Sequence, residues 1–63
     1  MNTLTVSLEL PKDMLGTLDV SETRLGTRLK ELIAIELFRE GRISSGKGAE
    51  LLGVPKVDFI RLL

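Results

Sequence analysis

The sequence lacks several residue types on which small proteins often depend. Its 63 residues include no cysteine, histidine, tryptophan or tyrosine. Disulfides are therefore excluded, and the preferred soft ligands of structural zinc are missing. A chain this short buries only about 60% of its unfolded surface, so it usually needs a crosslink, a metal or self-association. We expect no cofactor and no metal site, and a homodimer or higher homo-oligomer.

Catalysis has few candidate residues. The commonest general base and the commonest nucleophile–base pairs require His or Cys, and the sequence has neither. Ser44 and Ser45 precede an expected helix, where capping explains them better than nucleophilicity. "SSGKG" lacks the spacing of a phosphate-binding loop. We expect that the protein is not an enzyme.

Long apolar runs are also missing. None approaches the roughly 20 residues that a membrane span requires. The N-terminus "MNTLTVSLELPKD" has no basic region followed by a long apolar core, which is the pattern of a signal peptide. We therefore expect no membrane association and a cytoplasmic location.

Charge is balanced overall but uneven along the chain. Nine Lys and Arg face nine Asp and Glu. Residues 1–40 carry five basic and seven acidic side chains, a net charge of −2, whereas residues 41–63 carry four and two, a net charge of +2. A strongly basic nucleic-acid binder would carry a large net positive charge, which this chain does not. Its excess of basic residues nevertheless lies in residues 41–63, the segment that contains the turn at Gly53.

The N-terminal segment "TLTVSLEL" alternates strictly between apolar and polar residues. This period predicts a half-buried strand within residues 1–10. A single strand cannot satisfy its own backbone, so we expect it to pair with its copy across a dimer. The strand residues assigned to dimerisation are Leu4, Val6 and Leu8.

Residues 11–41 are expected to form a helical core. "PKDMLGTL" predicts a short helix after Pro11, and a long helix is expected from Glu22 to Glu40, ended by Gly41. The apolar surface of the long helix is broader than a small core requires, so part of it should face another subunit. Gly26 lies inside this helix at a cost that close packing would explain. The helix residues assigned to dimerisation are Ile35 and Leu37.

Residues 42–63 fit a helix-turn-helix. Ala49 is the small residue on the first helix, Gly53 supplies the turn, and Phe59 lies on the inner face of the second helix. The second helix would present Lys56 to guanine, Val57 to a thymine methyl and Asp58 to cytosine. The residues assigned to DNA are Arg42 and Lys47, nearer phosphates, with Lys56, Val57, Asp58 and Arg61 on the outward face. The fold class is thus mainly α, in one domain of residues 1–63.

Three alternatives stay open on the residues alone. The turn at Gly53 could be a helical corner packed only for stability. The strand could be the reading element of a ribbon-helix-helix DNA binder, although its outward face carries Glu9 and no basic residue. The chain could also be a dimeric protein-interaction module that never contacts DNA. RNA binding has little support, because Phe38 and Phe59 are the only aromatic residues and both lie on apolar stripes.

The order of these segments resembles uncharacterised protein family 175, small prokaryotic proteins regarded as antitoxins. The most specific part is "ELFREGRISSGKGAELLGVPKVDF", in which Gly48 replaces the Ala of the family pattern. The resemblance implies autorepression of a toxin–antitoxin operon through binding to double-stranded DNA, and a PIN-domain-type toxin as a further partner. Family members commonly continue into a polar acidic tail, which this sequence does not contain.

Overall fold

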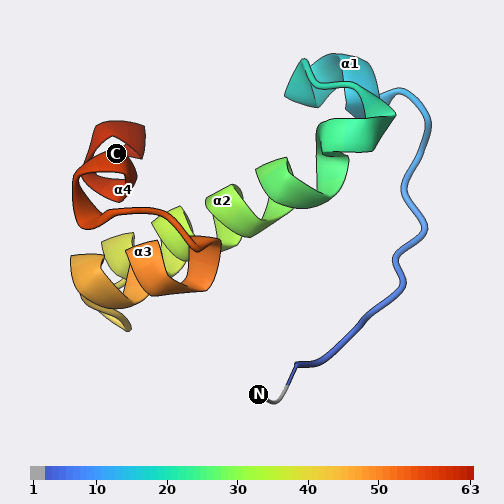
Figure 1. Cartoon of the computed structure of the whole chain (residues 1–63). Coiled ribbons are helices and arrows are strands. Elements are labelled where there is room, and N and C mark those ends of the chain that lie inside the picture. The colour runs from blue at the N-terminus through green and yellow to red at the C-terminus, as the bar shows by residue number, and fades with distance from the viewer. Residues whose placement is uncertain (1–2) are drawn as a thin grey trace.

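The computed structural model describes residues 3–63, and the regular elements in this range are all helices. Figure 1 shows α1 at one end of the long helix α2, with α3 and α4 packed at its other end. None of the helices in the described range is long and apolar enough to cross a membrane. The elements are α1 (Met14–Leu18), the 3-10 helix η1 (Glu22–Arg24), α2 (Leu25–Arg39), α3 (Ser45–Leu52) and α4 (Lys56–Leu62).

The predicted N-terminal strand is wrong. Residues 3–10 form an irregular arm without strand hydrogen bonding, and every residue of the arm is exposed. Figure 1 shows the arm extending from α1 without regular structure, and residues of the arm and of α2 together line one hollow. Alternation of apolar and polar residues gives a segment two faces, but a strand also needs a neighbour for its N–H and C=O groups. No segment of residues 3–63 forms a strand, so the ribbon-helix-helix alternative has no strand with which to contact DNA.

Three helix ends use the same backbone geometry. In each, a residue with positive φ follows the last turn: Asp19 at 56°, Gly41 at 75° and Gly53 at 68°. The next N–H then reaches back to a carbonyl five residues earlier, at 3.3 Å from Val20 to Leu15 and 2.9 Å from Arg42 to Leu37. This arrangement satisfies the last carbonyls of the helix. It confirms the expected left-handed glycine at position 41.

The long helix is shorter than predicted. Residues 22–24 form a 3-10 turn, and regular α-helix begins at Leu25. Ser21 has the extended backbone of an N-cap, but its side chain makes no cap hydrogen bond. Its hydroxyl instead lies 3.0 Å from that of Thr23. Without a side-chain acceptor for the first N–H groups, the tighter 3-10 turn opens the helix.

The fully buried apolar core lies entirely in the C-terminal part of the described chain. It consists of Ala34, Ala49 and Phe59, one residue from each of α2, α3 and α4. Four partly buried side chains pack around it: Ile35, Phe38, Leu52 and Val54. We call residues 34–62 the three-helix unit. Ile35, which the sequence assigned to dimerisation, packs in this unit, whereas Ile33 is 59% exposed.

Candidate nucleic-acid interface

The turn between α3 and α4 is tightly hydrogen-bonded. Gly53 donates its N–H to the Glu50 carbonyl at 3.1 Å, and Val54 donates to the Ala49 carbonyl at 3.1 Å. These two bonds require the positive φ of Gly53. Pro55 then has a φ of −62° and an extended ψ, so it serves as the N-cap of α4. The predicted turn residues, Ala49 and Gly53, therefore both lie where the motif needs them.

The start of α3 is held by a side-chain cap. Ser44 has extended backbone dihedrals, and its hydroxyl oxygen accepts a hydrogen bond from the Lys47 N–H at 3.1 Å. This bond satisfies one of the free donors in the first helical turn. It also explains why Ser44, rather than Ser45, is the capping residue.

The crossing of α3 and α4 is fixed by Phe59. Its side chain is 0% exposed, and its ring meets that of Phe38 edge-on, with 5.8 Å between the centroids. A Cβ at Gly48 would lie closer than 3.0 Å to three carbons of the Phe59 ring. Real Cβ atoms do not come so close, so Gly48 allows the ring to rest on the backbone of α3. The position where this sequence has Gly48 in place of the Ala of the family pattern is therefore the position at which the Phe59 ring packs against α3.

Burial of Phe59 turns the opposite side of α4 toward solvent. Four of the residues assigned to DNA lie on α4, and all four are exposed: Lys56, Val57, Asp58 and Arg61. The exposed surface also contains Ile60, which the sequence-based assignment missed although it follows Val57 at helical spacing. This outward surface of α4, residues 56–58, 60 and 61, is the candidate interface.

The basic residues around the motif differ in their ion pairs. The Arg42 Nε donates to Glu40 Oε1 at 2.8 Å, and the Lys47 Nζ lies 3.6 Å from Glu50 Oε1. Among residues 3–63, no carboxylate lies within 4.0 Å of the charged groups of Lys56 and Arg61. Lys56 and Arg61 can therefore meet an anion without first breaking an ion pair.

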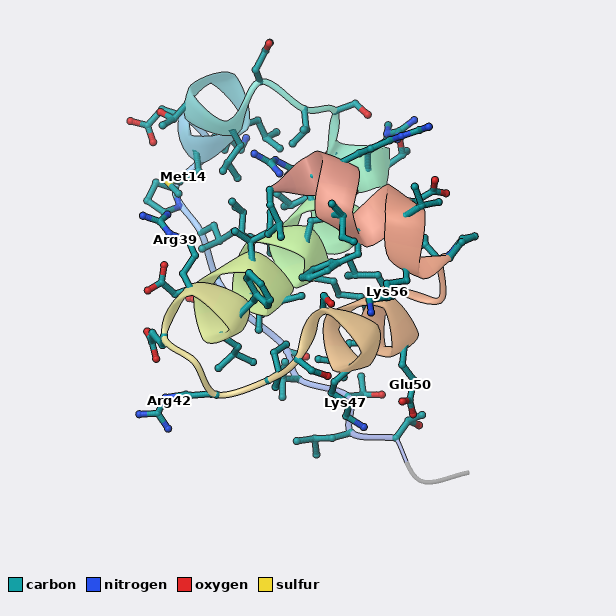
Figure 2. All side chains as sticks on the ribbon, turned by 90° about the vertical axis from the view of Figure 1, so that its left-hand side faces the viewer. Met14, Arg39, Arg42, Lys47, Glu50 and Lys56 are labelled. Carbon is teal, nitrogen blue, oxygen red and sulfur yellow. The ribbon has the colours of Figure 1, made fainter. Side chains whose placement is uncertain are left out.

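Figure 2 shows Lys47 and Glu50 projecting from α3 on the side away from α4, with Arg42 at the same edge of the molecule. The structure thus separates the assigned residues into two groups, with α3 between them. In a helix-turn-helix, the second helix enters the groove while the flanking residues meet the backbone. Lys56 and Arg61 belong to α4, whereas Arg42 and Lys47 lie at the opposite edge of α3.

Nothing in the described range gathers three or more potential metal-ligating side chains into a cluster. No buried side-chain nitrogen or oxygen atom in this range lacks a hydrogen-bond partner.

The sequence was compared with known proteins. A profile of the uncharacterised protein family UPF0175 matches residues 1–63. The chain belongs to this family. A UPF0175 protein from Archaeoglobus fulgidus is 44% identical over 55 residues, which cover 87% of this chain and 61% of the relative. The chain thus spans about 61% of the length of the curated relative that it matches. No solved structure matches it.

Proposed function

We propose that this protein is an antitoxin-like transcriptional regulator that binds double-stranded DNA as a homodimer. The observation that carries the proposal is the α3–Gly53–α4 arrangement, in which Phe59 buries one side of α4 and leaves the other exposed. A helix reads a major groove only when its outward side chains are free of the core. The turn, the crossing and the exposure of α4 together favour this use.

The chemistry of α4 suits base reading more than tight phosphate binding. Lys56 at its first turn can donate to guanine O6 or N7, Asp58 can accept from the cytosine amino group, and Val57 can meet a thymine methyl. Neither cation of α4, Lys56 or Arg61, has an ion pair among residues 3–63. Because one copy offers so few donors, affinity depends on two copies that bind two half-sites.

The antitoxin part of the proposal rests on the family resemblance. Members of the family are regarded as antitoxins, often beside PIN-domain-type toxins, and the chain belongs to that family. A regulator of this kind would repress its own operon and bind the toxin. The chain covers only 61% of the curated relative, so a toxin-contacting part is not assigned to any residue here.

The test is a fluorescence-anisotropy titration against the duplex immediately upstream of the coding sequence, with a scrambled duplex as control, at several salt concentrations. We expect tight binding to the upstream duplex alone. Lys56→Ala should weaken binding by about 1–3 kcal/mol if it contacts a base. Arg61→Ala should lower the salt slope by about 1 if it contacts a phosphate.

Lys12→Ala is the matched control. Lys12 is exposed and precedes α1, at the far end of α2 from α4 (Figure 1). The Lys12→Ala variant removes one positive charge, as the α4 variants do. If DNA affinity falls only in Lys56→Ala and Arg61→Ala, the effect belongs to α4. Equal weak binding to both duplexes, with equal losses in all three variants, would leave only nonspecific attraction and overturn sequence-specific binding.

A second function is favoured by one observation. Val57 and Ile60 are 53% and 50% exposed on the outward surface of α4. Adjacent exposed apolar side chains are common at protein interfaces. If α4 binds a protein and not DNA, Ile60→Asp should abolish that association while Lys56→Ala has little effect. The duplex titration separates the two functions, because only DNA binding gives a salt slope that depends on Lys56 and Arg61.

A further inference from the structure

The exposed side chains of α4 are sorted around the helix by type. Counted from the buried Phe59, Ile60 lies about 100° and Val57 about 160° around the helix in one direction. Asp58 and Arg61 lie at about 100° and 160° in the other direction. Val57 and Ile60 therefore form one flank of the outward surface, which we call the apolar flank. The two charged residues form the other.

The two side chains of the apolar flank are neighbours that the chain itself does not cover. They are three residues apart, so they lie next to each other on the helix surface. Both are about half-exposed, and neither is among the partly buried side chains that pack against the core. Valine and isoleucine are also weaker helix formers than alanine or leucine. Neither burial nor helix propensity within the described chain therefore accounts for Val57 and Ile60.

Each side chain of the apolar flank has a cation one turn away. Lys56 precedes Ile60 by four residues, and Arg61 follows Val57 by four. Among residues 3–63, no carboxylate lies within 4.0 Å of the charged groups of these two cations. Apolar groups between unpaired cations complement the major groove at thymine, where a methyl group lies between two phosphate backbones. A standard protein interface buries about 800 Å² on each partner, and two half-exposed side chains supply only a small part of it.

The spacing of the two side chains fits neighbouring base pairs. Three residues of α-helix advance about 4.5 Å along the axis, and one base pair of DNA advances about 3.4 Å. When the helix follows the groove, Val57 and Ile60 thus meet adjacent base pairs. The first residues of a recognition helix are the ones that reach base edges. Leu63, three residues beyond Ile60, is the C-cap of α4 and lies outside this range.

We propose that Val57 and Ile60 together recognise the methyl groups of two neighbouring thymines in each half-site. Thymine is the only base with a methyl group in the major groove, so these contacts select two consecutive T·A pairs. The inference rests on the proposed function, because it requires α4 to lie in the groove. It adds Ile60 as a specificity-determining residue beside Val57, and it gives part of the sequence that the protein recognises.

The test replaces thymine by uracil, one position at a time, in the duplex immediately upstream of the coding sequence. Uracil lacks the 5-methyl group but keeps the O4 acceptor of thymine, so only the apolar contact is removed. Fluorescence anisotropy with the full chain should show affinity falling about fourfold at each of two adjacent positions per half-site, as expected for one methyl group. Uracil at other positions should have little effect.

Alanine variants assign the two positions. Val57→Ala should lose the sensitivity to uracil at one position and keep it at the neighbouring position, and Ile60→Ala should do the reverse. Leu63→Ala is the matched control and should keep both sensitivities. Leu63 is 52% exposed and Ile60 is 50% exposed, so the two variants remove similarly exposed apolar side chains. All three residues are exposed, and circular dichroism checks that each variant folds.

Three results would contradict the inference. If the upstream duplex is bound more tightly than a scrambled one but uracil has no effect, thymine recognition is wrong and the proposed function stands. If both duplexes are bound equally, the proposed function fails and the inference fails with it. If Val57→Ala and Ile60→Ala lower affinity equally for thymine and uracil duplexes, the apolar flank does not contact the methyl groups and contributes through a protein contact.

Discussion

The N-terminal region of this chain, residues 3–33, contains more leucine than the C-terminal region, residues 34–63, with eight leucines against five, yet it buries less. All fully buried residues of the described range lie at position 34 or later, and residues 3–33 contribute none. The C-terminal region has the two aromatic rings and the small residues Gly48 and Ala49, which let one ring approach a helix backbone. Apolar composition alone does not produce a core, because burial also needs complementary shapes.

Local helix signals do not account for the difference. The ends of α1, α2 and α3 have the same two-bond geometry, although α1 ends at Asp19 and the others at glycines. Each helix is therefore terminated equally well in both regions. The regions differ instead in packing, because Leu25 and Leu29 are only half-buried and Ile33 is exposed, whereas Ala49 and Phe59 are fully buried.

The largest expected effect is the loss of Phe59. Phe59→Ala should destabilise the protein by about 3–5 kcal/mol, because it empties the centre of the three-helix unit. Leu18→Ala removes a half-buried side chain from α1 and should cost far less. Thermal unfolding followed by circular dichroism, at one fixed chain concentration, measures both. Equal losses would contradict the division into two regions.

A smaller effect is expected from adding one methyl group at Gly48. Gly48→Ala should cost about 1–3 kcal/mol, because the new Cβ overlaps the Phe59 ring. Gly46→Ala is the control on the same helix, where the new Cβ would lie 3.8 Å from the Ser44 hydroxyl, an ordinary contact. It should stabilise slightly through helix propensity. Stabilisation by both variants in chemical denaturation would show that Phe59 does not rest on Gly48.

The smallest effect concerns two serines that precede helices. Ser44→Ala should cost about 1 kcal/mol, since it removes the cap hydrogen bond to the Lys47 N–H. Ser21→Ala removes only an exposed contact with Thr23 and should change stability by less than about 0.5 kcal/mol. Urea denaturation compares the two. A larger loss from Ser21 would mean that the N-terminal region contributes more stability than its burial indicates.

Local signals in the sequence predicted the local structure well. Gly41, Ser44 and Gly53 each have the conformation or the bond that their residue types favour at helix ends. The inner position of Phe59 followed from helical spacing for the same reason. Such signals act within a few residues, so they need no knowledge of the rest of the fold.

Features that depend on distant partners could not be predicted in this way. The alternation at Leu4, Val6 and Leu8 indicates a strand only if a neighbouring strand exists. The apolar surface of α2 is so broad that periodicity did not decide which side packs inward, and Ile35, which the sequence assigned to dimerisation, packs against the core. The need for glycine at position 48 depends on a ring eleven residues further along the chain.

The most direct test of the two-region account is hydrogen–deuterium exchange of the full chain at several protein concentrations. The account predicts that amides of α3 and α4 exchange most slowly even at the lowest concentration, because they belong to the three-helix unit. Amides of residues 22–33 should exchange faster, because none of these residues is fully buried. Equal, concentration-independent protection of residues 22–33 and of α3 and α4 would contradict the account.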